Sequence, residues 1–106
     1  MSKAIKSICE RVRDWLYNRY GPSIKAVILY GSHVRGEASQ ESDIDLLVIV
    51  DNNLDPWEVH HDLDALLFDI LLETEQLVSV VVVPEEFYER YSSPFLINVR
   101  REGVIV

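Results

Sequence analysis

The sequence predicts an α/β (α+β) fold, in which helices pack against a small mixed β-sheet. Three apolar runs have the length of buried strands, and other segments repeat apolar residues every three or four positions, as helices do. The connection between the first two runs is too short to hold the full helix of a parallel crossover. We therefore expect these two strands to be antiparallel neighbours in a single domain, residues 1–106.

Turn and capping residues mark where the elements begin and end. Gly21 suits the position after a helix, so it ends the first one. Asp55-Pro56 and Ser93-Pro94 each join a capping side chain to a proline at the first helical position. The expected order is helix 4–20, strand 24–30, helical turn 33–37, polar loop 38–42, strand 44–50, helix 56–73, strand 77–83, short helix 85–91, helix 94–102 and extended tail 104–106.

Apolar patterning indicates how the central elements are covered. Residues 44–50 are apolar nearly throughout, which is typical of a central strand buried on both faces. Residues 56–73 carry an apolar stripe along one side of a helix, and Trp57 is expected to pack with it. Pro84 stops the third strand, because a proline cannot donate to a strand ladder.

Composition narrows the classes of partner. The formal net charge is −8, and affinity for a phosphate backbone comes mainly from lysine and arginine, so nucleic acid is not expected as the main partner. No apolar run approaches the ~20 residues of a membrane span, and no membrane partner is expected. Cys9 is the single cysteine and cannot form an internal disulfide, which indicates a reduced, cytoplasmic setting.

A pair of carboxylates, Asp43 and Asp45, stands at the start of the second strand. Positions two apart on a strand point to the same face, so the two charges lie close together and raise one another's pKa. A hard cation such as Mg²⁺ can supply the counter-charge, and it is usually bound by one or two carboxylates together with substrate phosphates. These two residues are the candidate metal ligands and catalytic carboxylates.

Gly31 and Ser32 directly follow the first strand. Glycine lets a phosphate approach the backbone closely, amides in such a turn can bind anions, and the Ser32 hydroxyl adds a donor. An anion-binding turn therefore adjoins a cation-binding carboxylate pair. This combination fits a complex of a metal ion with a nucleoside triphosphate.

Gly31-Ser32, ten further residues and Asp43-x-Asp45 form a motif that resembles the signature of the DNA-polymerase-β-like nucleotidyltransferases. The sequence of residues 31–48 is similar to that of the minimal nucleotidyltransferase branch of the superfamily, and the similarity extends along nearly the whole chain. The resemblance implies a polymerase-β-like nucleotidyltransferase fold. It also implies that Gly31 and Ser32 bind the triphosphate of ATP. Asp43 and Asp45 then bind Mg²⁺, which aligns an in-line attack on the α-phosphate.

Arg35 belongs to the same motif. The resemblance implies that it neutralises phosphate charge or braces the loop. The residues alone leave an equal alternative, in which Arg35 pairs with Glu37 or Glu41 at the surface. His33, inside the loop, is expected to be solvated.

The chain departs from the family pattern on the third strand. Family members normally carry a third carboxylate there, which helps to hold the metal and serves as the base, and Ser79 stands where it is expected. A serine hydroxyl has neither the charge to hold a second metal nor a pKa suited to base catalysis. Either Glu73, Glu75 or a partner supplies the carboxylate, or the domain binds nucleotide and transfers it slowly or not at all.

The resemblance implies transfer of a nucleoside monophosphate, with AMP from ATP as the leading case, to a hydroxyl group. Minimal members commonly pair with a small helical HEPN-type protein as the antitoxin of a toxin–antitoxin pair, and modify a tyrosine of that toxin. The alternative is a module that neutralises its partner by contact alone. Small-molecule modification ranks last, because the chain has no room for an acceptor-binding domain. Homo-oligomers stay open, and apolar residues 95–97 can serve an interface or the core.

Overall fold

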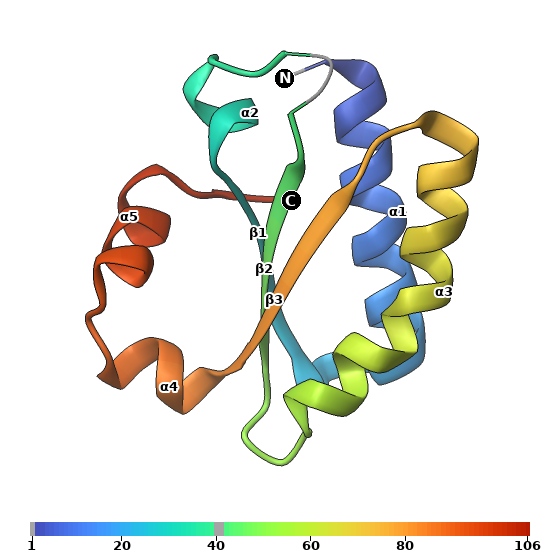
Figure 1. Ribbon diagram of the computed structural model, residues 1–106. Coiled ribbons are helices and arrows are strands. Elements are labelled where there is room, and N and C mark those ends of the chain that lie inside the picture. Colours follow the sequence, from blue (N-terminus) through green and yellow to red (C-terminus); the bar gives the residue numbers. More distant parts are fainter. Residues whose placement is uncertain (1, 40–41) are drawn as a thin grey trace.

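The computed structural model describes residues 2–39 and 42–106 and shows a four-stranded mixed sheet with helices on both faces (Figure 1). The predicted fold class is confirmed. The elements are α1 (Lys3–Tyr20), a 3₁₀ turn (Gly21–Ser23), β1 (Ile24–Tyr30), α2 (Ser32–Arg35), β2 (Ile44–Val50), α3 (Pro56–Thr74), β3 (Val78–Pro84), α4 (Glu85–Arg90), α5 (Pro94–Glu102) and β4 (Val104–Ile105).

The strands lie in the order β3-β2-β1-β4. β1 and β2 are antiparallel, as their short connection predicts. β3 is parallel to β2, and α3 supplies the long crossover that a parallel pair requires. The tail was expected only to be extended, but it adds a fourth strand antiparallel to β1, and the Val106 amide donates to the Val27 carbonyl at 3.0 Å.

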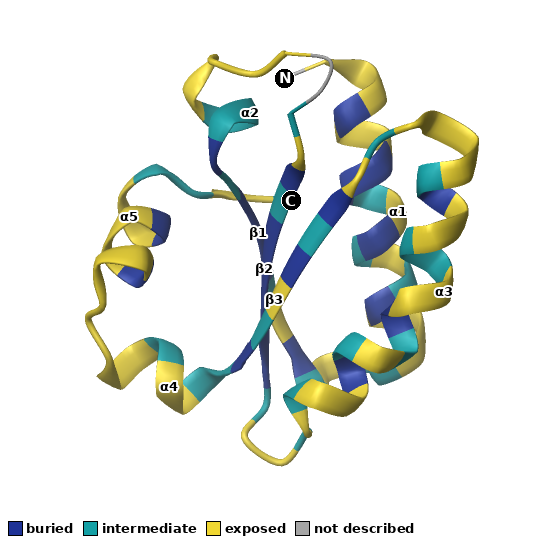
Figure 2. Cartoon of the chain, in the orientation of Figure 1, coloured by how far each residue is buried: buried dark blue, intermediate teal, exposed yellow. Residues whose placement is uncertain are grey.

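The sheet separates two apolar layers (Figure 2). Because side chains alternate along a strand, Leu46 and Val48 of β2 join the layer under α1 and α3, whereas Leu47 and Ile49 join the layer under α4 and α5. β2 is buried on both faces, as its continuous apolar sequence predicts. Cys9 lies in the first layer as a buried core residue, and burial raises the pKa of its thiol to about 11.

Side-chain caps begin the three longest helices. The Asp55 carboxylate accepts a hydrogen bond from the Trp57 amide at 3.0 Å, and the Ser93 hydroxyl accepts one from the Leu96 amide at 3.2 Å. Both caps confirm the sequence signals. Ser2 caps α1 in the same way, through the Ile5 amide at 3.2 Å.

Some expectations need correction or fall outside the described residues. Trp57 does not pack into the core, because it lies at the start of α3 beside the edge strand β3, and it is 77% exposed. Residues 40–41 of the predicted polar loop lie outside the described part, and so does the alternative pairing of Arg35 with Glu41. In the segment 95–97, Leu96 is buried and its two neighbours are exposed.

Across residues 2–39 and 42–106, no helix combines the length and the apolar character that crossing a membrane would require.

Candidate nucleotide and metal site

Asp43 and Asp45 lie at the end of the sheet where β2 begins. Asp43 is exposed in the loop that precedes the strand, and Asp45 is half-buried within it. Burial raises the pKa of Asp45 above its usual value, and the nearby charge of Asp43 raises it further. The charges of His33 and Arg35 lower the pKa of Asp45 and partly offset these two effects. The pair therefore carries negative charge that its surroundings only partly compensate.

Gly31 approaches the Asp45 carboxylate so closely that no side chain could stand between them. A Cβ atom built on Gly31 would collide with Oδ2 of Asp45. Gly31 also has φ 85° and ψ −155°, a backbone conformation that is essentially restricted to glycine. Two independent constraints thus require glycine here, and the fold places the turn after β1 directly against the carboxylate of β2.

α2 is a single helical turn that begins at Ser32. The amides of Val34 and Arg35 donate to the Gly31 carbonyl at 3.1 and 3.2 Å, which closes the turn. Gly36 ends it with φ 76°, in the left-handed region. Ser32 is half-buried at the first position of this turn, one residue beyond the glycine that touches Asp45.

His33 has a structural role that sequence reasoning missed. Its Nε2 atom donates a hydrogen bond to the Ser42 carbonyl at 3.1 Å. This bond joins α2 to the residue immediately before Asp43, so the two halves of the candidate site are tied together across the loop. The expectation of a solvated histidine is wrong, and its position between the two motif segments was the signal that could have suggested the role.

Arg35 forms two ion pairs instead of projecting freely from the loop. Its Nε atom lies 3.1 Å from Glu37, and its Nη1 atom lies 3.1 Å from Glu102 at the end of α5. The second pair spans 67 residues and links α2 to the helix that covers the sheet. These contacts are those of a brace, which is one of the roles that the sequence left open.

Ser79 is the direct neighbour of Asp45 on β3. The parallel register pairs these two residues, and the antiparallel register pairs Asp45 with Tyr30 on the other side. Paired positions point to the same face, so Tyr30, Asp45 and Ser79 form one row across the sheet. The strand position assigned from the sequence to the missing carboxylate is therefore beside Asp45.

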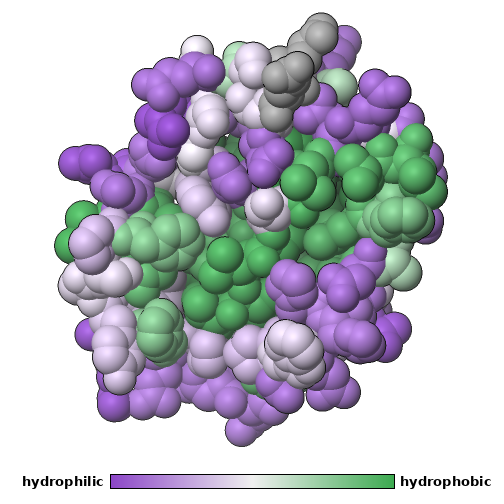
Figure 3. All heavy atoms as spheres, viewed as in Figure 1, coloured by the Kyte–Doolittle hydropathy of each residue, from purple (hydrophilic) through white to green (hydrophobic). Residues whose placement is uncertain are grey.

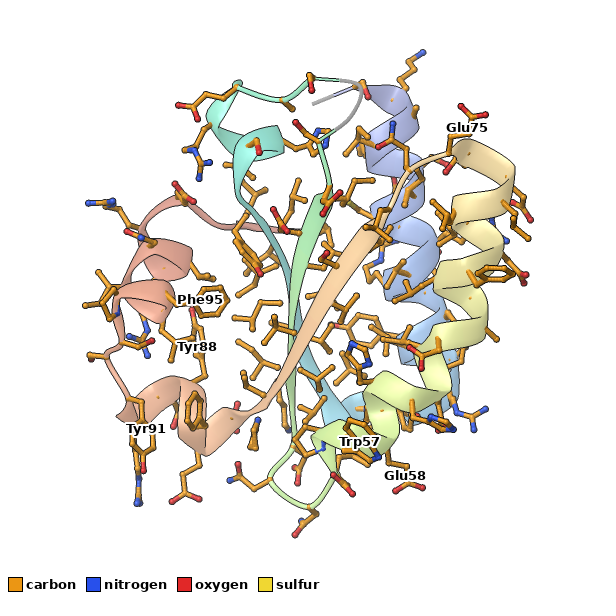
Figure 4. All side chains as sticks on the ribbon, in the orientation of Figure 1. Trp57, Glu58, Glu75, Tyr88, Tyr91 and Phe95 are labelled. Atoms are coloured by element: carbon orange, nitrogen blue, oxygen red, sulfur yellow. The ribbon has the colours of Figure 1, made fainter. Side chains whose placement is uncertain are left out.

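Neither glutamate suggested as a substitute reaches this row. Glu73 lies on α3, on the opposite face of the sheet, and binds Arg11 at 2.6 Å, a hydrogen bond that lowers its pKa. Glu75 ends α3 with φ 61°, and its side chain points outward from the end of the helix (Figure 4). Within residues 2–39 and 42–106, no group of three or more metal-ligating side chains is present.

Tyr30 and Phe95 close the β1 side of the row. Their rings meet edge to face with centroids 5.3 Å apart, and Phe95 projects from α5 toward the sheet (Figure 4). Burial raises the pKa of Tyr30 to about 12, and the charge of Asp45 adds to this effect. Tyr30 is therefore protonated at neutral pH and unsuited to act as a base there.

The donor set of Asp43 and Asp45 fits one hard divalent cation. Two carboxylates that repel one another gain from a shared counter-ion, and Mg²⁺ commonly takes one or two carboxylates and completes its shell with water and phosphate oxygens. The set does not fit a second ion bound by a third carboxylate on β3, because Ser79 stands at that position. The arrangement can bind a metal–phosphate complex beside the glycine turn.

Comparison with known proteins places this geometry in a family. The family model described as polymerase beta, nucleotidyltransferase matches residues 10–93. MJ0604 of Methanocaldococcus jannaschii, provisionally named a protein adenylyltransferase, is 32% identical over 105 residues that cover 98% of this chain and 95% of its own. MJ1305 of the same organism, with the same provisional name, is 35% identical over 71 residues, 67% of this chain and 46% of its own.

Solved structures share the fold. A crystal structure of a toxin–antitoxin with AMP-PNP superposes with a TM-score of 0.58 and 22% identity over 91% of this chain and 70% of the other. The toxin–antitoxin MntA–HpeT, in a variant with two aspartates two positions apart replaced by glutamate, gives a TM-score of 0.60 and 19% identity over 91% and 69% of the two chains. These likenesses show the polymerase-β-like fold that the sequence resemblance implied.

Proposed function

The chain belongs to the polymerase β nucleotidyltransferase family, and we propose that it transfers AMP from magnesium-bound ATP to a hydroxyl group of a partner protein. The observation that carries the proposal is the contact between the Gly31 backbone and the Asp45 carboxylate. It brings a turn that can receive phosphate against a residue that can bind the metal, which is the arrangement that a metal–triphosphate complex needs.

Each motif residue has a role in this proposal. The Ser32 hydroxyl and the backbone at Gly31 hold the triphosphate, and Asp43 and Asp45 hold Mg²⁺. The ion, when bound, neutralises the phosphate charge and stabilises the departing pyrophosphate. Arg35 positions the turn through its pairs with Glu37 and Glu102, and its charge moderates the negative potential at Asp45.

A protein acceptor is favoured by the kinds of protein that resemble this chain. Two relatives carry provisional names as protein adenylyltransferases, and structural neighbours are components of toxin–antitoxin complexes, one of them with AMP-PNP. A HEPN-type helical toxin is accordingly the proposed partner, and a tyrosine hydroxyl on it the proposed acceptor. The acidic chain is then the antitoxin of the pair.

Ser79 supports a second candidate function. With serine beside Asp45, the described residues place no third carboxylate next to the two candidate metal ligands to take the proton of an acceptor hydroxyl. A domain of this kind can bind nucleotide and neutralise its partner by contact without transferring AMP. The partner can also supply the missing base, in which case transfer occurs only in the complex.

Incubation with Mg²⁺ and ATP labelled at the α-phosphate tests the proposal, with the chain alone and with the product of the gene next to its own. We expect label on the partner that disappears in the double variant Asp43→Asn, Asp45→Asn. The control is Asp51→Asn, which alters a carboxylate beyond the far end of β2, where Asp51 pairs with Lys25 at 3.7 Å.

The outcomes separate the two candidates. Label that survives the double variant would exclude the proposed site. Absence of label together with measurable ATP binding would favour neutralisation by contact. Absence of ATP binding by a folded chain would refute both nucleotide-dependent functions.

A further inference from the structure

β3 is an edge strand of the sheet. It pairs with β2 on one side, and within the described residues no strand pairs with its other side. Residues 78–83 contain five valines and one serine, without any charge. Free strand edges are normally protected by charged side chains, proline or a covering element, because their unpaired backbone groups recruit other strands. A long, apolar and uncharged edge therefore indicates a surface that is covered in use.

A groove runs along this edge between β3 and one side of α3, and we call it the α3–β3 groove. Two adjoining hollows of about 530 and 360 Å³ share His60 and Val80 in their linings. Trp57 stands at the end where α3 begins, and Phe68 and Leu77 stand toward the other end. The side chains of α3 that line it recur at helical spacing, so the groove follows residues 78–82 of β3.

The walls of the α3–β3 groove are exposed aromatic and aliphatic side chains. Trp57 is 77% exposed, Phe68 58% and Leu77 47%. Figure 3 shows a hydrophobic area that crosses the centre of the view, over β3 and the adjoining part of α3, with hydrophilic residues above and below it. Contiguous apolar surface with a polar rim marks an interaction site more often than scattered apolar residues do.

The charge of α3 decides what kind of partner fits. The helix carries five acidic residues and no lysine or arginine. Two of the five, Asp62 and Glu73, are paired with arginines of α1, but Asp64 lines the groove, where His60 lies 3.6 Å from it. A second copy of the chain docked edge to edge would bring two acidic helices together. A basic partner complements this surface.

We propose that the α3–β3 groove binds an extended, basic segment of the acceptor protein, which adds a strand to the edge of β3. Its backbone groups pair with β3, its apolar side chains fill the hollows beside Trp57 and Phe68, and its lysine or arginine residues face Asp64. The identity of this partner as the acceptor rests on the proposed function. Ser79 lines the groove and also stands beside Asp45, so a segment docked there presents a side chain next to the candidate site.

The approach of an acceptor from this side also agrees with the row across the sheet. On the β1 side, Asp45 is flanked by Tyr30, whose ring packs against Phe95. On the β3 side it is flanked by a small serine on an edge strand. The β3 edge is thus the more open of the two in-sheet approaches to Asp45.

A fluorescent nonapeptide of alternating lysine and valine with a central tyrosine is the probe, and fluorescence anisotropy measures its binding to the full chain. We expect binding that weakens at least about tenfold in Asp64→Lys and in Val81→Lys. Asp14→Lys on α1 is the matched control, because Asp14 and Asp64 side chains are 61% and 60% exposed and the charge change is the same. Ile105→Lys controls for the other sheet edge.

Two control peptides separate charge from strand pairing. Replacing each lysine by glutamate removes the charge complementarity, and placing proline at alternate positions removes the backbone donors. Both changes should weaken binding at least about tenfold. Circular dichroism establishes that each variant is folded.

Several results would overturn the docking proposal. The first is an equal loss of peptide binding in Asp14→Lys and Asp64→Lys. The second is a loss of peptide binding in Ile105→Lys but not in Val81→Lys. The third is no binding of the basic peptide by the folded chain. Self-association of the wild-type chain that Val81→Lys abolishes would assign the edge to a second copy. ATP binding by the same samples keeps the proposals apart: docking variants should retain it, and the Asp43→Asn, Asp45→Asn variant should lose it while still binding the peptide.

Discussion

Ser79 and Asp45 are register partners on two parallel strands, and their side chains point to the same face of the sheet. Ser79→Asp would therefore place a third carboxylate directly beside the candidate metal ligands. We expect the affinity for Mn²⁺ without nucleotide to rise about tenfold or more, since added ligand charge strengthens oxygen-ligand sites. Calorimetric titration measures the change. In the absence of metal, the added like charge should lower the melting temperature.

Ser79→Asn is the matched control for that substitution, because asparagine has the shape of aspartate without its charge. If both variants change metal affinity equally, Ser79 does not stand at a metal-binding position. If only the aspartate variant gains affinity and also transfers AMP faster than the wild-type chain, the serine limits the natural activity.

Gly31→Ala should be far more damaging than Gly36→Ala. Both glycines have positive φ, but a Cβ on Gly31 collides with Asp45, whereas a Cβ on Gly36 meets nothing within 4 Å. We expect about 1 kcal/mol of destabilisation for Gly36→Ala, because alanine there only has to adopt the left-handed backbone conformation. For Gly31→Ala we expect roughly 3 kcal/mol, together with loss of ATP binding. Urea unfolding measures both, and equal destabilisation would contradict the close approach of Gly31 to Asp45.

Asp45→Asn should stabilise the chain at neutral pH. The folded state raises the pKa of Asp45, so it binds the proton more tightly than the unfolded chain, and stability falls as pH rises above the ordinary value of 3.8. Asparagine carries no charge, so it removes the destabilisation that the ionised Asp45 carboxylate causes. The melting temperature of the variant should therefore exceed that of the wild type at pH 7, and the difference should shrink as pH falls toward 3.8.

Added Mg²⁺ should change the melting temperatures of the wild-type chain and of Asp45→Asn differently. Mg²⁺ should raise the melting temperature of the wild-type chain at pH 7 and leave Asp45→Asn unchanged, because binding to the native state alone stabilises it. A wild-type chain that is more stable than the variant at pH 7 without metal would contradict the assignment of Asp45 as an uncompensated charge.

Arg35 and Glu102 can be separated by paired substitutions. If Arg35 acts through its ion pair to α5, then Arg35→Gln and Glu102→Gln should weaken ATP binding to a similar small extent, within about threefold of the wild type. If Arg35 contacts phosphate directly, only the arginine variant should weaken binding, by about tenfold or more. Titration with ATP distinguishes the two roles, and the present geometry favours the first.

Local chemistry made most of the elements predictable. Gly21, Asp55 and Ser93 mark helix ends through backbone conformation and side-chain caps, which depend on a few neighbouring residues. The short connection between β1 and β2 predicted their antiparallel pairing. β4 was missed as a paired strand because its two residues carry no periodic signal, and only the exposed edge of β1 selects them.

The candidate site shows where sequence reasoning ends. The motif spacing predicted that Gly31 and Asp45 lie close together in space. The position of Ser79 depended on strand register, since a slip of one residue moves every side chain of the strand to the other face of the sheet. Trp57 was assigned to the core because apolar residues on a helical stripe usually pack inward. Its exposure follows from β3 being an edge strand, which is a property of the complete sheet.

The two layers of the fold are unequal in size, and this has a consequence for motion. Among the described residues, seventeen buried side chains form the layer under α1 and α3, whereas six form the layer under α4 and α5. Regions with fewer buried contacts open at lower free energy than the global unfolding reaction. Amide hydrogen exchange should therefore be faster in α4 and α5 than in β2 and α1. Because Glu102 of α5 pairs with Arg35, each such opening would also break one of the contacts that hold α2, the turn that carries Ser32, so the weaker half of the molecule would determine how long this brace persists.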